Sequence, residues 1–177
     1  MTEKSAVNRP FKKHEVEDYE KKRYRGIDQR LVHAREVRII KRILMKIGGD
    51  SQLALDVPCG YGRFSHLLLD NGLFVVNSDL SSHMVKRAVQ RHHGNYRFVA
   101  AGVVVDVKQG FPFKQNVFNI LLSMRFFHHV HEEKEREFII KEFFYVSEKW
   151  VILSYYQANL PHLFQRRIRR KIKKSKT

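Results

Sequence analysis

The chain has 177 residues, 43% of them hydrophobic, and a formal net charge of +16 at pH 7. Its length is that of one domain, no run reaches the roughly 18 apolar residues of a membrane span, and residues 1–13 lack the apolar core of a signal peptide. The single cysteine excludes an internal disulfide framework and is typical of a reducing compartment. We therefore expect a soluble cytoplasmic protein, which basic segments could bring to the inner membrane surface.

The positive charge belongs to the two ends of the chain. Residues 1–47 hold 14 Lys and Arg against 7 Asp and Glu, residues 48–165 hold 12 against 11, and residues 166–177 hold 8 against none. A compact basic tail predicts contact with a polyanionic surface, either RNA phosphates or anionic lipid headgroups. A membrane-surface contact over residues 163–176 would also use the apolar side chains of that segment. A solvated C-terminus that binds nothing fits the same composition equally well.

Strand-like and helix-like segments alternate along the middle of the chain. Apolar residues at helical spacing predict an amphipathic helix over 30–47, which Gly48 and Gly49 end. The expected order after it is a strand over 53–57, a helix over 63–70, a strand over 73–79, a helix capped by Ser81 or Ser82, a strand within 96–105, a strand over 118–124, a helix over 132–148 and a strand over 150–155. This alternation predicts a Rossmann-like α/β fold, a mostly parallel sheet of about five strands with helices on both faces.

Two of these helices have a predicted inner face. In the helix after Ser82 the inner residues are Met84, Val85, Ala88 and Val89, and in the helix over 132–148 they are Phe138, Ile139, Phe143 and Val146. His92 and His93 are interpreted as a solvated helix end. The chain as a whole is expected to divide into a charged segment over 1–29, one domain over 30–156 and a basic tail or helix over 157–177.

The first predicted strand leads into a glycine loop, Leu-Asp-Val-Pro-Cys-Gly-Tyr-Gly-Arg-Phe over residues 55–64. Gly60 and Gly62 let the backbone turn tightly and approach a ligand closely. A dinucleotide-binding loop would have a third glycine where this chain has Ser65, and Asp56 at the mouth of the loop would repel a pyrophosphate. A carboxylate there suits a ligand with an ammonium group and no phosphate, and S-adenosylmethionine has that character.

A second acidic residue follows the second predicted strand. Asp79 lies in Val-Val-Asn-Ser-Asp-Leu-Ser, residues 75–81, and comes 17 residues after Gly62. A carboxylate at this strand end can accept hydrogen bonds from both hydroxyls of a ribose, and it disfavours a phosphorylated ribose. Asp56 and Asp79 could each cap a following helix instead, but their joint presence at two strand ends favours a ligand role.

These two segments resemble the first two motifs of class I S-adenosylmethionine-dependent methyltransferases, especially small-molecule-type domains with a D-x-x-C-G-x-G-R loop, and the likeness extends from about Tyr24 to Tyr155. It implies a methyltransferase with S-adenosylmethionine as cofactor. Val105-Asp106-Val107 is similar to the third motif, which faces the adenine, and residues 123–129 match the stretch that lines the methyl-donor pocket. The implied cofactor residues are Asp56, Pro58, Cys59, Gly60, Gly62, Arg63, Asp79, Leu80, Ser81, Asp106, Val107, Met124 and Arg125.

Methyl transfer needs mainly alignment of donor and acceptor, and it needs a general base only when the nucleophile arrives protonated. His129, and after it His128, are the candidate bases, because the family places pocket residues just after the fourth strand. The alternative is that both are pocket walls. Tyr19 and Tyr24 are candidates for closure over the substrate. We expect no metal, because adjacent histidines on an extended segment point in opposite directions, and we expect Cys59 to pack within the loop.

The chain departs from the resembling family in two places. Asn119 stands where the fourth strand usually has Asp, and we predict no strand after Tyr156, where the family ends on an antiparallel hairpin. The predicted fifth strand would then be an exposed apolar edge. Homodimerisation across that edge, coverage by the N-terminal helix, or a shortened chain would each explain it.

The methyl acceptor can be narrowed by exclusion. The sequence lacks the (Asp/Asn/Ser)-Pro-Pro-(Tyr/Phe) motif of amino-methylating nucleic-acid enzymes, and its only cysteine lies in the cofactor loop. A small molecule, or a lipid or sugar intermediate, is therefore favoured, and RNA is the other acceptor considered. The main alternative to an enzyme is a non-catalytic module that binds the donor, RNA or a membrane surface. A nucleotide-dependent oxidoreductase is disfavoured by Ser65 and Asp56.

Overall fold

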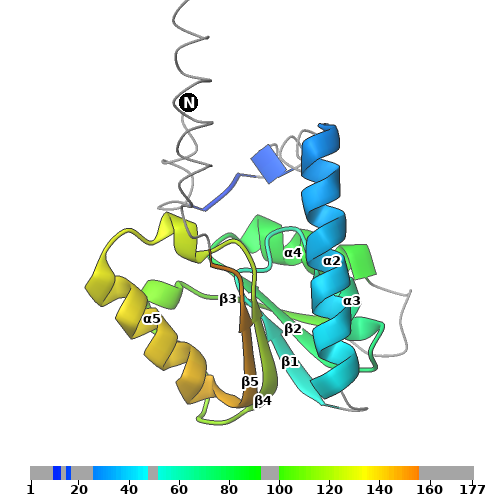
Figure 1. Ribbon diagram of the computed structural model, residues 1–177. Coiled ribbons are helices and arrows are strands. Elements are labelled where there is room, and N and C mark those ends of the chain that lie inside the picture. Colours follow the sequence, from blue (N-terminus) through cyan, green and yellow to red (C-terminus); the bar gives the residue numbers. More distant parts are fainter. Residues whose placement is uncertain (1–9, 13–14, 17–25, 48–51, 93–99, 156–177) are drawn as a thin grey trace, which may run out of the picture.

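The computed structural model describes residues 10–12, 15–16, 26–47, 52–92 and 100–155. Helices and strands alternate along these residues as predicted (Figure 1). In chain order the elements are α2 (Ile27–Ile47), β1 (Leu53–Asp56), α3 (Ser65–Leu69), β2 (Phe74–Asp79), α4 (Ser82–His92), β3 (Ala100–Val104), the 3-10 turn η2 (Val107–Gln109), β4 (Phe118–Ser123), the 3-10 turn η3 (Phe127–His129), α5 (Glu133–Val146) and β5 (Ser147–Leu153).

The five strands form one sheet in the order β3-β2-β1-β4-β5. Every neighbouring pair is parallel, with Leu55 of β1 opposite Val76 of β2 and Leu121 of β4. The chain leaves β1 toward β2 on one side and later returns to β4 on the other, so the strand order reverses between β1 and β4. Ligands of open α/β sheets bind beyond the carboxyl ends of the strands at such a point. The predicted Rossmann-like α/β fold is confirmed.

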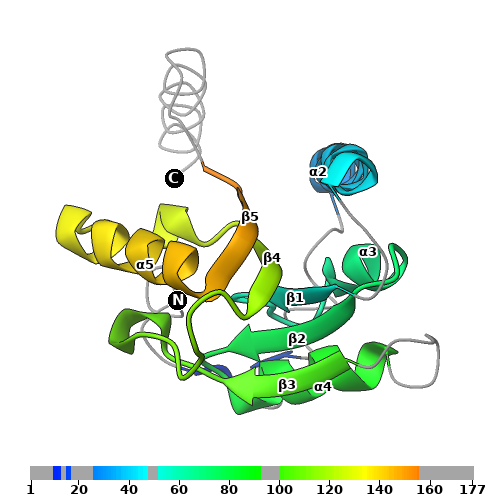
Figure 2. The ribbon, with the colours of Figure 1, turned by 90° about the horizontal axis from the view of Figure 1, so that it is seen from below.

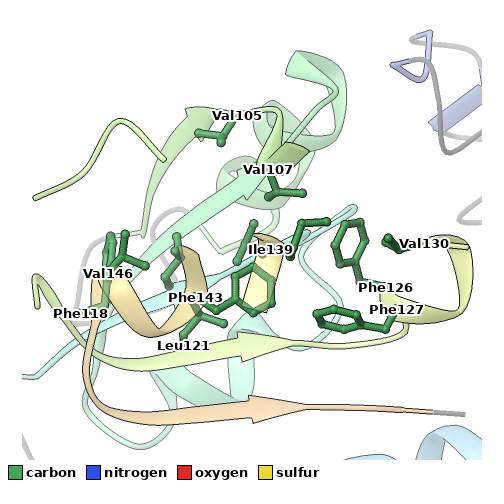
Figure 3. Close-up of a cluster of buried hydrophobic side chains, with 12 residues drawn as sticks. Val105, Val107, Phe118, Leu121, Phe126, Phe127, Val130, Ile139, Phe143 and Val146 are labelled. Atoms are coloured by element: carbon green, nitrogen blue, oxygen red, sulfur yellow. The ribbon is translucent and has the colours of Figure 1, made fainter. Parts of the chain in front are cut away.

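Helices cover both faces of the sheet, as Figure 2 shows. On one face, Ile139, Phe143 and Val146 of α5 pack on Leu121 and Phe118 of β4 (Figure 3). On the other face, Ile40 and Leu44 of α2 join a second buried cluster with residues of α3, β1, β2 and β4. Helix α4 packs on β2 and β3 on this second face, because Gly102 of β3 leaves room for the Val85 side chain. The two clusters hold the strand ends in fixed positions.

The predicted inner faces of the helices are largely correct. Ser81 caps α4, with its Oγ accepting from the Met84 N–H at 3.4 Å, and Met84, Val85 and Ala88 are buried while Val89 is half-buried. In α5 the prediction for Phe138 is wrong, since its side chain is 40% exposed. At 100° of rotation per residue, Phe138 lies about 100° round the helix from Ile139 and therefore flanks the buried stripe.

Strand β5 begins directly after α5, three residues earlier than predicted, and pairs with β4. Within the described ranges it is an edge strand, and its Trp150 and Leu153 are 47% and 38% exposed. Ile152 packs against the cluster that contains Ile40 and Leu44 of α2. The N-terminal helix therefore shields one face of β5 but does not pair with its edge. No helix among the described residues is long and apolar enough to cross a bilayer.

Candidate functional site

The glycine loop connects β1 to α3 at the carboxyl edge of the sheet. Gly60 and Gly62 have positive φ angles of 53° and 76°, a backbone region that favours glycine. A Cβ on Gly62 would lie 2.9 Å from the Cα of Ala88, so only glycine lets the loop rest against α4. A Cβ on Gly60 would meet no atom within 4 Å. The loop is thus anchored at Gly62 and faces open space at Gly60, where a ligand can approach the backbone.

Three hydrogen bonds hold this loop in place. The Cys59 N–H donates to the Ser78 carbonyl at 2.8 Å, and the Gly60 N–H donates to Asp79 Oδ2 at 3.0 Å. His92 Nε2 lies 2.9 Å from the Gly62 carbonyl, and because a carbonyl only accepts, Nε2 carries the proton. His92 is 6% exposed, so its interpretation as a solvated helix end was wrong: the last turn of α4 lies against the loop.

Asp79 lies at the end of β2 as predicted. Its Oδ1 accepts from the Ser81 N–H at 3.0 Å and its Oδ2 accepts from Gly60. Burial raises the pKa of Asp79, while the backbone hydrogen bonds from Ser81 and Gly60 act in the opposite direction. A carboxylate has about four acceptor positions, so both oxygens can still accept a ligand hydroxyl. Asp79 does not cap α4, because Ser81 does.

Asp56 is the most buried charged group of the site. It is 2% exposed at the end of β1, and its Oδ2 lies 2.7 Å from the Ser65 hydroxyl. The same hydroxyl lies 2.6 Å from Asn77 Oδ1. Burial is the main cause that raises the pKa of Asp56, to about 7, with a smaller contribution from Asp79, while the Ser65 hydrogen bond lowers it. Asp56 is thus built into the floor of the site, and not on an exposed rim.

Cys59 is 6% exposed, and its thiol donates to the Gly60 carbonyl at 3.2 Å. Burial and the nearby carboxylates of Asp79 and Asp56 raise its pKa well above the usual value, so the group is a neutral thiol. The preceding residue, Pro58, is joined to Val57 by a cis peptide bond. Both predicted cofactor residues therefore form the backbone of the loop, and Cys59 has the packing position expected for it.

Two arginines that were predicted to contact the cofactor share one acidic partner on α2. Glu36 accepts two hydrogen bonds from Arg125, at 2.7 Å from Nε and 2.9 Å from Nη2. Arg63 Nη1 lies 3.6 Å from the same carboxylate, and its guanidinium stacks 3.9 Å above the Phe64 ring. All three charged side chains are only 13–16% exposed. This ion-pair group ties α2 to the loop after β1 and to the segment after β4.

The remaining predicted cofactor residues lie around the same edge. Asp106 caps η2, accepting from the Lys108 N–H and from Gln109 Nε2, each at 3.1 Å. Val107 is buried in the hydrophobic cluster that contains Phe143 of α5. Met124 is partly buried against the hydrophobic cluster that contains Ile40 and Leu44 of α2. Leu80 is half-buried and Ser81 is 1% exposed. Strand ends and short turns therefore bring these residues to one edge.

His128 and His129 lie in η3, not on the extended segment that the sequence suggested. Their ring centroids are 3.8 Å apart, so the argument that the two rings point apart was wrong. His128 is exposed and His129 is half-buried. Across the described part of the chain, no group of three or more potential metal ligands comes together.

Several residues of the site were not found from the sequence. Ser65 and Asn77 lie in or beside the motifs that the sequence shows, but their hydrogen bonds around Asp56 were not predicted. His92, which contacts the loop, and Glu36, which binds the arginines, belong to neither motif. The predicted closing residues Tyr19 and Tyr24, His93 and the basic tail over 157–177 lie outside the described residues.

A segment near the N-terminus also reaches the loop. Phe11 and Val16 pack with Tyr61 of the loop and Met84 of α4. The Ser81 hydroxyl donates to the Phe11 carbonyl at 2.8 Å. The chain before α2 thus adds to one wall beside the loop.

Comparison with known proteins gives the family. Residues 54–148 match the model of a family described as a methyltransferase domain. A probable 18S rRNA (guanine-N(7))-methyltransferase from Dictyostelium discoideum is 32% identical over 73 residues, which are 41% of this chain and 23% of that protein. The chain therefore matches less than a quarter of the length of this curated relative.

Solved structures of methyltransferases share the fold. A SAM-dependent methyltransferase from Methanosarcina mazei has a TM-score of 0.63 and 25% identity, covering 71% of this chain and 62% of that one. Magnesium protoporphyrin IX methyltransferase from Synechocystis with bound SAM has a TM-score of 0.70 and 20% identity, covering 93% and 84%.

The family match covers more than half of the chain and spans the site, from β1 through the glycine loop to α5. It confirms the predicted family, the predicted cofactor and the methyltransferase class. The chain belongs to the methyltransferase domain family, whose members take their methyl group from S-adenosylmethionine.

Proposed function

We propose that this chain binds S-adenosylmethionine beyond the carboxyl ends of β1 and β2 and directs its methyl group to an acceptor. The observation that carries the proposal is the pairing of Gly60 with Asp79. The Gly60 Cα faces open space, and its N–H is held by a carboxylate that keeps acceptor positions for ribose hydroxyls. Both features are needed for a ribose to lie against the loop.

The donor set fits this cofactor. Asp56 and Asp79 give the site acidic character, which suits a ligand with an ammonium and a sulfonium and disfavours a pyrophosphate. The hydroxyls of Ser78 and Ser123, at the carboxyl ends of β2 and β4, are buried without a hydrogen-bond partner among the described residues. When bound, the cofactor supplies an activated methyl group. The protein's task is to align that group and to exclude water.

Each predicted residue has a role in this proposal. Asp79 accepts from the ribose hydroxyls, and the buried carboxyl group of Asp56 lies on the ammonium side, where its oxygens can accept a hydrogen bond. The loop residues Pro58, Cys59, Gly60 and Gly62 shape the cradle. Leu80, Ser81, Asp106 and Val107 border the adenine, while Arg63, Met124 and Arg125 border the methionine portion.

The acceptor nucleophile would approach from the segment after β4. His129 is our first candidate for a general base and His128 the second, because both follow β4 directly and His129 is half-buried. A base is needed only for an acceptor that arrives protonated. If the acceptor arrives with a free lone pair, the same two rings serve as pocket walls.

The acceptor that we propose first is a small molecule, or a lipid or sugar intermediate, as the sequence favours. RNA is the second candidate, supported by the name of the Dictyostelium relative. The basic tail over 163–176 is proposed to contact an anionic surface, in keeping with a cytoplasmic protein that can lie at the inner membrane. A donor-binding module without catalysis is the alternative function.

Binding and turnover separate these alternatives. Equilibrium dialysis of the chain with S-adenosylmethionine and with NADH should show saturable binding of the first alone. Turnover is then followed as S-adenosylhomocysteine formed when total RNA, a polar lipid extract or a small-molecule metabolite extract is added. Product formation with any of the three supports the enzyme and names its acceptor class. NADH binding in place of the donor would overturn the proposal, and donor binding without product would leave the non-catalytic module.

A further inference from the structure

The face of α2 that points away from the sheet carries positive charge without compensation. Five of its basic side chains are exposed and have no ion pair among the residues that the structure describes: Arg35, Arg38, Lys41, Arg42 and Lys46. Of the two acidic residues of α2, Asp28 lies in the first turn and Glu36 is bound to Arg125. At a rise of 1.5 Å per residue, the five basic residues extend over about 16 Å.

The position of this face follows from the buried face of the same helix. Ile40 and Leu44, four residues apart, are the two fully buried residues of α2, and the basic residues lie on the other sides of the helix. Figure 1 and Figure 2 show α2 standing on the outside of the sheet beside α3. The basic face is therefore turned to solvent along the length of the helix.

Uncompensated charge of this kind costs helix stability. Arg38 and Arg42, and Arg42 and Lys46, are four residues apart, and each such like-charge pair destabilises the helix. Helix α5 shows the opposite arrangement, because Lys141 pairs with Glu137 at 2.8 Å and Glu135 pairs with Lys108 at 2.9 Å. A polyanion bound along α2 would remove its repulsion.

We propose that the outer face of α2 binds RNA through the phosphate backbone. A membrane surface fits less well, because a helix that lies on a bilayer inserts a continuous apolar stripe. On α2 the apolar stripe is already used by the core. The exposed apolar residues of α2 do not form a stripe of their own, because at 100° per residue they are spread over the same sides of the helix as the basic residues: Ile27, Leu31, Val32, Ile39 and Met45. Point contacts from flexible Lys and Arg to phosphates need no such stripe.

The inner side of α2 places this surface beside the donor site. Glu36, on the inner side, binds Arg125 after β4 and Arg63 after the glycine loop. Arg35, next to Glu36, therefore lies nearest to the carboxyl ends of β1 and β4, and the basic face runs from there toward Lys46 and the amino end of β1. Binding to this face does not depend on methyl transfer, so it can be tested separately from the proposed function.

The test compares two double variants of the full chain by fluorescence anisotropy with a labelled RNA hairpin over a range of salt concentrations. Arg38→Gln with Arg42→Gln removes two charges from α2. Lys134→Gln with Lys149→Gln removes two exposed charges from α5 and β5 that have no ion pair with any described residue, and it is the matched control. We expect the α2 variant to bind at least about fivefold more weakly at low salt, with a slope of log K against log salt shallower by roughly 1.5, since each lost phosphate contact removes about 0.7–0.9. The control should stay within about twofold of wild type.

Equal affinities of the two double variants would overturn the proposal, because binding would then come from other basic segments or from net charge alone. Vesicles of phosphatidylserine and phosphatidylcholine provide the second comparison. If the α2 variant loses vesicle binding and keeps RNA binding, the partner is a membrane and the proposal is wrong. Far-UV circular dichroism and thermal unfolding should be the same in all three proteins, which shows that they are folded whether or not they bind the donor. If the double variant does not fold, each single arginine variant should show about half the change in slope.

Discussion

Ser65 Oγ lies 2.7 Å from Asp56 Oδ2 and 2.6 Å from Asn77 Oδ1, so one hydroxyl proton stands between two buried oxygens. Asn77 Nδ2 faces the Ala101 carbonyl at 3.4 Å, which directs the amide oxygen toward Ser65. A protonated Asp56 completes a chain of donors from Asp56 through Ser65 to Asn77. The pKa of Asp56, raised to about 7 mainly by burial, agrees with a proton on this carboxyl group below neutral pH.

This arrangement predicts how stability depends on pH. Between the ordinary Asp pKa of 3.8 and the native value of about 7, the native state holds a proton that the unfolded state has lost. The free energy of unfolding therefore falls as pH rises through this window, by up to about 4 kcal/mol at 1.36 kcal/mol per pKa unit. Asp56→Asn copies the neutral acid and should remove this fall. Urea unfolding of both proteins between about pH 4 and 8 measures the difference between their free energies of unfolding. The contributions of the other titrating groups are common to both proteins and cancel in this difference. Parallel curves for the two proteins would show that Asp56 is ionised throughout.

The two loop glycines should respond differently to the same substitution. Gly62→Ala places a Cβ 2.9 Å from the backbone of Ala88 at a φ of 76°, and we expect a loss of about 2–4 kcal/mol in the free energy of unfolding. Gly60→Ala meets no atom within 4 Å and should cost only about 1 kcal/mol, from its positive φ. The new methyl group then projects into the space that we assign to the donor, so S-adenosylmethionine should bind at least about tenfold more weakly. A Gly60→Ala protein that binds the donor as tightly as wild type would contradict this placement.

His92 should act on the donor through the loop. Burial lowers the pKa of His92, and its neutral ring donates to the Gly62 carbonyl from the end of α4. His92→Leu leaves that carbonyl without a donor and should cost about 1–3 kcal/mol in unfolding free energy, with weaker donor binding. His92→Gln keeps an N–H at the same distance along the side chain and should restore most of both quantities. Calorimetry and urea unfolding of both variants test this prediction. Equal losses of donor affinity and of unfolding free energy in the two variants would show that His92 contributes by packing and not by its hydrogen bond.

Local pattern was enough to predict the strands and most helices, because buried strands and the inner stripes of α2 and α4 repeat with regular periods. The glycine loop and Asp79 could also be predicted, since these residues lie directly at or after the ends of predicted strands. What was missed depends on contacts between distant residues. His92 is 30 positions from Gly62, and Glu36 is 89 from Arg125, so only the folded sheet brings them together.

Two errors had a more local origin. Phe138 is apolar and adjacent to the buried stripe of α5. Residue type alone does not show whether a side chain at the border of the stripe is buried or exposed. The segment with His128 and His129 follows a strand, so the sequence alone predicts that its backbone is extended. The chain instead turns into η3, where the backbone brings the two rings to the same side.

The most direct test of the account is calorimetric titration of S-adenosylmethionine into wild type, Asp79→Asn and Asp70→Asn. Asp79 carries both the Gly60 contact and the proposed ribose contact, whereas Asp70 is an exposed carboxylate at the end of α3. We predict that Asp79→Asn weakens binding at least about tenfold, or ~1.4 kcal/mol, and that Asp70→Asn binds like wild type. Equal affinity of all three proteins, or no binding by a folded wild-type chain, would contradict the assignment of the donor to this loop.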